Sequence, residues 1–341
     1  MTTAAQVARG KVIHWDRFLQ RQELHQADYQ IVIPTFDRPD ELCGNTLALL
    51  KDDGINMDRV NIFVSPRVAK KNKQPEWYRY LEACNSNGYS GVKVRPGGRN
   101  LEEQMTMAMK WAGSGYIVVM SDTVRRIRTA LRQDSTVISV PSAKGTIPSL
   151  IEHGYRLMKA TGCVAWSVNP SHNPRNLECE KISRKLGLLD GNLTGMLLPP
   201  NWKRMRVTKG HGLIYDVEWS AALWSNGYRF FRYRGLCCEH QYRQEGGQAT
   251  LMNDVLLRRK LENDAISKVS KKYPQCLQVM HKPKASLRTM EYRFNTKGPA
   301  NLMMSIRKPG RKRKYHTHAP SSPAERMRRY RQRRRAVRVQ R

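Results

Sequence analysis

The sequence predicts an α/β protein built on a mostly parallel, Rossmann-like sheet with helices on both faces. Two observations predict this class. Short β-branched runs alternate with segments of helical periodicity between residues 29 and 120. Polar residues and prolines follow several of these runs, as they do at the strand ends of open α/β sheets. The order strand, helix, strand, helix, strand is typical of a doubly wound sheet.

The first predicted strand is the β-branched run 31–33, and it ends at a polar loop, residues 35–38. Pro34 and Pro39 bracket the loop and hold it extended. A helix is expected over 40–50, where apolar residues recur at helical spacing behind two acidic residues. Because ligands bind at the carboxyl ends of strands in open α/β sheets, this loop is a candidate ligand contact.

The remaining elements follow in order along the chain. Strands are expected at 60–64, 92–94, 116–120, 164–168 and 228–233, and helices at 77–84, 101–111, 147–160 and 216–226. Residues 186–198 are rich in glycine and apolar residues, and the chain from Ile266 onwards is basic and mixed. Hydrophobic residues make up 40% of the sequence, which is enough to form a substantial core.

Positive charge is concentrated at the C-terminus. Lys and Arg total 61 against 28 Asp and Glu, a net charge of +33. Residues 307–341 contain 15 basic residues and one acid, so they carry +14, and the other 306 residues carry 46 − 27 = +19. Such a distribution predicts a disordered basic tail and a polyanionic partner, most simply nucleic acid. The alternative is a solvated tail without a partner.

Several protein classes are not indicated. The seven cysteines show no C-x-x-C spacing, which argues against a disulfide framework and against a zinc knuckle. The chain has no apolar run of about 18 residues, as a transmembrane helix would need. Its first 30 residues lack the apolar core of a secretory signal. The sequence therefore predicts a cytoplasmic protein with no membrane partner, and it makes no prediction of an oligomeric state.

The order of short motifs along residues 29–250 resembles a known family. In chain order these motifs are IPTFDRP, NIFVSP, GGRN, the triplet SDT, WSVNPSHNP, DGNLTG, YDVEWSAALWSNGYRFFRY and YRQEGGQ. They are similar to the GT-A glycosyltransferases, and more closely to the DNA-base glycosyltransferases associated with TET/JBP dioxygenases. That family includes the base J glucosyltransferase of kinetoplastids and many phage members. The resemblance implies a GT-A-like domain at 28–265, flanked by an arm (1–27), a basic extension (266–306) and the tail (307–341).

The resemblance also implies donor contacts. Thr35, Asp37 and Arg38 would hold the nucleotide of a UDP-sugar. Arg99 and Asn100 would open a helix whose N–H groups face the diphosphate. The alternative for Arg99 is a surface residue beside a helix cap.

The predicted catalytic base is Asp216, which matches an aspartate of the family, with Glu218 as second candidate. Tyr215 stands where the family usually has a glutamate. A carboxylate in this position would take the proton of the acceptor hydroxyl. The alternative is that Asp216 caps the helix that follows.

Metal dependence is left open by the sequence. The family's Asp-x-Asp triplet, which binds Mg²⁺ or Mn²⁺, is here Ser121-Asp122-Thr123. Asp122 and either His240 or His211 are the candidate ligands. Alternatively, the arginines at 125, 126 and 128 stabilise the leaving phosphate, or activity has been lost.

The expected function is transfer of a sugar to the hydroxymethyl group of 5-hydroxymethylcytosine or 5-hydroxymethyluracil in DNA, in a phage-infected host cell if the protein is viral. The target base would be flipped out of a duplex. Trp166 and the aromatic residues of 228–233 would either stack on it or belong to the core. Two alternatives are a non-catalytic nucleic-acid-binding protein on a degenerate GT-A scaffold, and a glycosyltransferase that acts on a glycan or a protein.

Overall fold

The computed structural model describes residues 27–66, 75–113, 115–133, 136–198, 202, 214–240, 255–281 and 290–295. All of them belong to one compact unit that ends at Leu302. The predicted tail 307–341, nearly all of the predicted arm 1–27, His211 and the YRQEGGQ segment lie outside the described residues. In the part that is described, no helix is long and apolar enough to cross a membrane.

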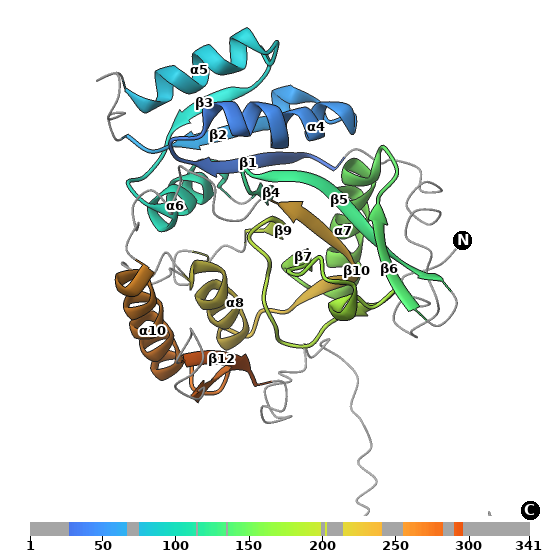
Figure 1. Cartoon of the computed structure of the whole chain (residues 1–341), viewed down its shortest axis with the longest axis vertical. Helices are drawn as coiled ribbons and strands as arrows, with labels where there is room; N and C mark the ends of the chain where they lie inside the picture. The colour runs from blue at the N-terminus through green and yellow to red at the C-terminus, as the bar shows by residue number, and fades with distance from the viewer. Residues whose placement is uncertain are drawn as a thin grey trace, which may run out of the picture. The chain divides into compact units, whose positions relative to one another are not determined.

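A ten-stranded sheet forms the centre of the described structure, with the order β3-β2-β1-β4-β9-β7-β10-β5-β6 and β8 paired to β10 (Figure 1). Its strands are β1 Tyr29–Thr35, β2 Val60–Val64, β3 Lys93–Pro96, β4 Tyr116–Met120, β5 Val124–Gln133, β6 Thr136–Pro141, β7 Ala165–Asn169, β8 Ile182–Ser183, β9 Leu193–Leu197 and β10 Phe230–His240. Strands β3, β2, β1 and β4 pair in parallel, as do β7 and β10. The remaining pairs are antiparallel. The predicted α/β class is confirmed.

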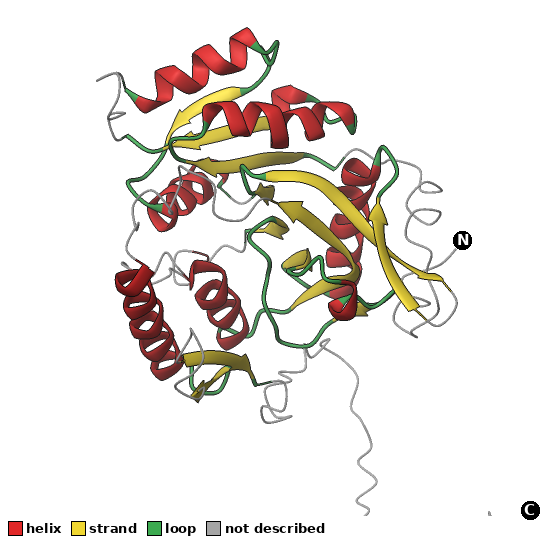
Figure 2. Cartoon of the chain, in the orientation of Figure 1, coloured by secondary structure: helices red, strands yellow, loops and turns green. Residues whose placement is uncertain are grey.

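Helices cover both faces of the sheet, as predicted (Figure 2). They are α3 Pro39–Glu41, the π-helix Leu42–Leu47, α4 Ala48–Asp52, α5 Glu76–Ser86, α6 Leu101–Ala112, α7 Thr146–Thr161, α8 Tyr215–Ser225 and α10 Val255–Lys272, with short 3₁₀ turns at Met57–Arg59 and Pro174–Asn176. A separate hairpin consists of β11 Leu277–His281 and β12 Met290–Phe294. Helix α10 runs through residue 265, where the sequence predicts a boundary.

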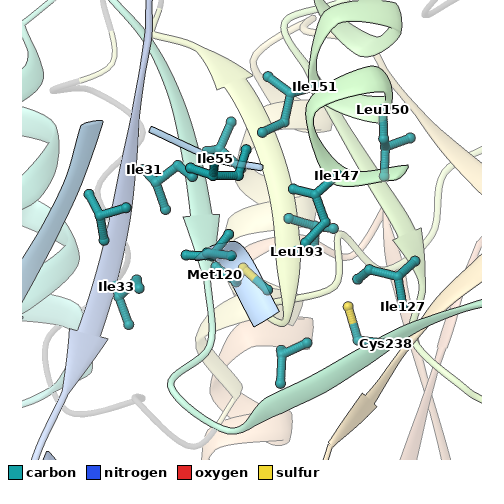
Figure 3. Close-up of a cluster of buried hydrophobic side chains, with 14 of the residues drawn as sticks. Ile31, Ile33, Ile55, Met120, Ile127, Ile147, Leu150, Ile151, Leu193 and Cys238 are labelled. Atoms are coloured by element: carbon teal, nitrogen blue, oxygen red, sulfur yellow. The ribbon is translucent and has the colours of Figure 1, made fainter. Parts of the chain in front are cut away.

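Alternation along the buried strands divides the core into two clusters. Ile31 and Ile33 of β1 pack on the face that carries the π-helix, α4, α5 and α7, and Figure 3 shows part of this cluster. Val32 points to the opposite face, which carries α6, α8 and α10. Strand side chains alternate with a period of two, so a strand buried on both faces is apolar throughout. This is why the β-branched runs were visible in the sequence.

Trp166 of β7 is part of the first cluster. Its side chain is fully buried, and its indole N–H donates to the hydroxyl of Tyr116 over 2.8 Å. A Cβ atom at Gly154 of α7 would lie 2.3 Å from the indole nitrogen, and one at Gly195 of β9 would lie 2.2 Å from it. The ring is therefore held between two backbones and cannot stack on a flipped base. Phe230, Phe231 and Tyr233 are likewise fully buried, so the core alternative holds for these rings.

The sheet contains strands that the sequence does not predict. Val124–Gln133 and Thr136–Pro141 form β5 and β6, the glycine-rich segment contains β9, and the strand expected at 228–233 continues to His240 as β10. The hydrophobic pattern does not predict strand β5, because arginines occupy four of its ten positions, VRRIRTALRQ. Its pairing partners are β6 and the distant β10, and only this tertiary pairing makes it a strand.

Strand polarity brings many segments to one edge of the sheet, called here the carboxyl edge. Strands β1 to β4, β7 and β10 all end there, because two successive antiparallel pairs place β7 parallel to β4. Strands β5 and β9 begin there for the same reason. Helix α6 follows β3 and α8 precedes β10, so both helices begin at this edge. Ligand sites of open α/β sheets form at such an edge.

Candidate functional site

The loop after β1 is docked on the start of α5. Asp37 adopts a left-handed backbone conformation with φ of 54°. Its N–H donates to Glu76 over 2.8 Å, and its carboxylate forms an ion pair with Arg79, also at 2.8 Å. The predicted nucleotide residue Asp37 is thus already paired through one oxygen. The contacts fix the course of the loop 36–38 before any ligand binds.

A chain of hydrogen bonds runs from this loop to Asp122 at the end of β4. The backbone N–H of Arg38 donates to the hydroxyl of Tyr80 over 2.9 Å, and Tyr80 contacts the hydroxyl of Thr35 at 2.8 Å. Thr35 donates to Asp122 over 2.6 Å. Since the Thr35 hydroxyl already donates its hydrogen bond to Asp122, the Tyr80 hydroxyl donates to Thr35. All hydroxyls of the chain therefore point towards one carboxylate, and such chains are cooperative.

Asp122 is buried, with 7% of its surface exposed. Burial raises the pKa of its carboxyl, while the charge of Arg38 and the Thr35 hydrogen bond oppose the rise. The guanidinium of Arg38 lies 3.7 Å from the second carboxylate oxygen. The structure thus brings together three predicted site residues, Thr35, Arg38 and Asp122. Both oxygens of Asp122 face partners from the protein.

Two side chains accept backbone N–H groups at the start of α6, in an arrangement similar to a capping box. Asn100 accepts the N–H of Glu103 over 2.9 Å, and Glu103 accepts the N–H of Arg99 over the same distance. Gln104, in the next turn, donates to the carbonyl of Thr35 over 2.8 Å, which ties α6 to the first loop. Arg99 and Asn100 are both exposed. The contacts show the capping role of this pair, and its contact with a diphosphate stays a prediction.

Asp216 lies in the first turn of α8 and is half-buried. Its carboxylate accepts the N–H of Val217 over 2.9 Å, whereas the N-cap residue of the helix is Ile214, which has no capping side chain. Burial raises the pKa of Asp216 to about 6. A carboxyl with this pKa is largely ionised at neutral pH and is still basic enough to take a proton.

Ser220 ties the start of α8 to the segment that leads into β9. Its hydroxyl donates to the carbonyl of Asp216 over 2.6 Å and accepts the N–H of Leu189 over 2.9 Å. Three residues further on, the carbonyl of Asn192 accepts the N–H of Ser121 over 3.1 Å. A short series of contacts therefore joins Asp216 to the residue that precedes Asp122.

Asp190 belongs to the same segment and was missed in the sequence. Its side chain is 4% exposed, and one oxygen accepts from the amide of Asn192 over 2.8 Å. The other oxygen has no hydrogen-bond partner among the described residues. Burial, and further the negative charge of Asp216, raise the pKa of Asp190 to about 8. Of the two carboxyl groups, Asp190 therefore holds its proton more tightly than Asp216. A lone aspartate before Gly191 gave no signal beyond a turn.

Glu218 has a different environment. Its side chain is fully buried and pairs with the ammonium group of Lys272 on α10 at 2.8 Å. The ion pair ties α8 to α10 and leaves this carboxylate committed to a protein cation. These contacts favour Asp216 over Glu218 as the base.

His240 ends β10 and pairs with Val124, two residues beyond Asp122 along the chain. Its ring lies 6.2 Å from that of His172, and burial lowers its pKa. Across the residues that the structure describes, no group of three or more His, Cys, Asp or Glu side chains is arranged to hold a metal ion. The described side chains therefore fit a divalent cation poorly, and the metal roles of Asp122 and His240 stay predictions.

No protein-family model matches the chain. No curated protein matches its sequence. Among solved structures, the chain is similar to the mannosyltransferase PcManGT from Pyrobaculum calidifontis in complex with GDP-Man and Mn²⁺, with a TM-score of 0.47 and 11% identity over 75% of this chain and 70% of the other. The chain is also similar to TarS 1–349 of S. aureus, with a TM-score of 0.42 and 7% identity over 71% of this chain and 69% of the other. For a UDP-glucose pyrophosphorylase complexed with UDP-glucose, the TM-score is 0.34 and the identity is 10% over 70% of this chain and 99% of the other. Because these TM-scores lie below 0.5, function is inferred below from the chain's own residues.

Proposed function

We propose that the protein is a glycosyltransferase that transfers a sugar from a UDP-sugar to the hydroxymethyl group of 5-hydroxymethylcytosine or 5-hydroxymethyluracil in DNA. The observation that carries the proposal is the position of Asp216. A half-buried carboxylate whose pKa is raised to about 6 lies at the same sheet edge as the loop after β1 and the end of β4. An alcohol acceptor needs such a base, because its hydroxyl is barely acidic in water.

The donor side of the site uses the first loop and α6. Arg38 directs a guanidinium towards the end of β4, where Asp122 holds it at 3.7 Å. The start of α6 carries the positive end of the helix dipole. Both features suit a diphosphate. Asp122 acts here as a positioning residue that orients Arg38.

Transfer then proceeds as a displacement at the anomeric carbon of the sugar. Asp216 takes the proton of the hydroxymethyl group as its oxygen forms a bond to that carbon. The bond between the carbon and the diphosphate oxygen breaks, and the nucleoside diphosphate leaves with the electron pair. Arg38 and the start of α6 stabilise the negative charge that develops on it. Each of these steps is assigned to residues of the chain alone, because the side chains that the structure describes do not assemble a metal site.

A DNA acceptor is supported by charge. The net charge is +33, and residues 1–306 alone carry +19 of it. A protein with this excess binds the phosphate backbone through counterion release, independently of base sequence. An enzyme that modifies a neutral glycan has no need of this charge.

The test is a transfer assay with purified protein, UDP-glucose or another UDP-sugar, and duplex DNA with or without 5-hydroxymethylpyrimidines. The expected result is a nucleoside that is heavier by one sugar residue in mass spectrometry of the digested, hydroxymethylated DNA, and no change in unmodified DNA. Glycan and protein acceptors in the same assay test the alternative acceptors. Absence of transfer to hydroxymethylated DNA with every donor would refute the proposal.

The second candidate is a non-catalytic nucleic-acid-binding protein on the same scaffold. The closed hydrogen-bond chain from Tyr80 through Thr35 to Asp122 favours it, because that carboxylate is occupied without a ligand. A thermal-shift measurement with UDP and UDP-sugars separates the two candidates. Under the first candidate, UDP and UDP-sugars bind the folded state and raise the unfolding temperature. Under the second candidate they do not bind, and the unfolding temperature stays unchanged.

A further inference from the structure

A surface pocket lies where the π-helix faces the start of β5. Its volume is about 340 Å³, and it is lined by Gly44, Asn45, Arg125, Arg126 and Glu239. Gly44 and Asn45 belong to the π-helix, the arginines to β5, and Glu239 to β10. The proposed transfer reaction makes no use of this pocket.

The pocket carries an excess of positive charge. Glu239 is neutralised by Arg128, which it contacts at 2.7 Å. Arg125 donates to the side-chain oxygen of Asn45, a neutral acceptor, over 3.1 Å. Within the described residues neither Arg125 nor Arg126 forms an ion pair. Arg125 and Arg126 both line the pocket, and neither has a carboxylate partner among the described residues.

The walls of the pocket are fixed in place. Thr46 of the π-helix accepts the N–H of Val124 over 3.0 Å, and its hydroxyl lies 2.9 Å from the carbonyl of Ser121. On the other side, Arg128 donates to Ser139 of β6 over 3.0 Å. These contacts fix the backbone of two walls, so ligand binding has to order only the exposed arginine side chains. π-helical turns also occur frequently at functional sites.

We infer that this pocket binds a backbone phosphate of the DNA acceptor. The planar guanidinium group binds phosphate and carboxylate in a bidentate manner, and phosphate is the anion that a DNA acceptor presents. Two of the walls, β5 and β10, belong to the half of the sheet that contains antiparallel pairs, whereas the third wall, the π-helix, follows the loop expected to hold the nucleotide. A DNA phosphate in the pocket anchors the acceptor where these two parts of the sheet meet, and the UDP titration below tests a donor phosphate as the alternative occupant. The inference rests on the proposed function only for the identity of the acceptor.

The main test measures the salt dependence of binding of the full chain to a short hydroxymethylated duplex, without donor. For R125Q/R126Q, the slope of log K against log salt is expected to fall by about 0.9, the value for one phosphate contact. The matched control is R132Q, an exposed arginine on the same strand outside the pocket, for which the slope stays unchanged. The C-terminal tail contributes equally to all variants, so the difference in slope isolates the pocket.

A second pair of variants leaves the arginines in place. A Cβ atom at Gly44 meets nothing within 4 Å, so a side chain can be introduced there without a clash at its Cβ. G44E adds a carboxylate to the pocket, and G44Q adds a neutral side chain of the same size. G44E is expected to weaken DNA binding several-fold at low salt and G44Q to leave it unchanged.

Titration with UDP separates the two sources of phosphate. Unchanged UDP affinity in R125Q/R126Q together with a smaller DNA slope supports the inference. Weaker UDP binding with an unchanged DNA slope would assign the pocket to the donor and overturn it, and so would unchanged values of both. Because no step of this test requires transfer, an inactive protein with the expected slopes would refute the proposed function and leave the pocket assignment standing.

Discussion

The two halves of the sheet each bring an aspartate to the carboxyl edge, and the protein holds the two carboxylates differently. Asp122, at the end of the parallel half, is buried and faces Thr35 and Arg38. Asp216 lies at the start of α8, beside the half of the sheet that contains antiparallel pairs, and is half-buried. Its carboxylate accepts a hydrogen bond from the backbone N–H of its neighbour Val217. The first carboxylate is suited to positioning, and the second is available to a substrate.

This difference shows that the residue type alone does not assign a role. Both aspartates have pKa values raised by burial, yet only Asp122 has a cation and a hydroxyl that oppose the rise. Partners supplied by β1 and its loop explain the first environment. The second depends on α8, which Ser220 fixes to the segment before β9.

The largest expected effect comes from removing the available carboxylate. D216N should lower kcat for sugar transfer by about 10²- to 10⁴-fold, the usual contribution of a general base. Because the amide has the same shape, the far-UV circular dichroism spectrum should stay unchanged. E218Q distinguishes the second candidate. If E218Q lowers kcat as much as D216N does, the assignment of the base to Asp216 is wrong.

The pH dependence should follow the same residue. Asp216 must be ionised to accept a proton, so activity should fall about tenfold per pH unit below its pKa of about 6 and reach a plateau above it. The folded pKa lies above the ordinary value of about 3.9. Folding is therefore disfavoured as pH rises from about 4 to about 6, and this loss persists above that range. D216N has no ionisable group at this position and therefore lacks this loss of stability. Thermal unfolding should show that D216N is more stable than wild type at pH 8, and the difference should disappear near pH 4.

A smaller effect is expected for the occupied carboxylate. T35V keeps the shape of the side chain and removes the hydroxyl that links Tyr80 to Asp122. Leaving these buried groups without their partner should lower the free energy of unfolding by about 1–3 kcal/mol, measured by urea denaturation. Y80F and the double variant complete a cycle in which the two losses should not add. Simple additivity would show that the hydroxyl chain is not cooperative.

The smallest effect concerns the start of α6. N100A removes the cap and should cost about 1 kcal/mol in thermal unfolding, whereas N100D keeps it. The two variants diverge further in UDP binding. N100D places a negative charge where a diphosphate is expected, so it should bind UDP more weakly than N100A despite its greater stability. Equal UDP affinities would place the diphosphate elsewhere.

The parallel half of the fold was predictable because its strands are buried on both faces. Val32, Ile62 and Val118 lie in runs that are apolar whichever way the side chains point, and such runs need no partner to be recognised. The arginine-rich β5 and the glycine-containing β9 take their strand character from pairing with β10, β6, β4 and β7. Local patterns do not contain that information.

The site was predictable in position and less so in its contacts. Motif order placed Thr35, Arg38, Asp122 and Asp216 on segments that the sheet brings to one edge. Burial and partners decide the rest, and they come from residues distant in sequence, such as Tyr80 beside Thr35 and Lys272 beside Glu218. Asp190 had no signal in the sequence because its raised pKa arises entirely from its surroundings in the folded chain.

The indole of Trp166, pressed between Gly154 and Gly195, provides an intrinsic optical reporter. Of the seven tryptophans, it is one whose ring has no contact with solvent, while Trp77 and Trp111 are 47% and 38% exposed. Its emission should therefore be blue-shifted and inaccessible to iodide quenching in the native protein. A tryptophan-to-phenylalanine series that retains only this fluorophore would report when α7 and β9 separate, independently of events at the sheet's edge.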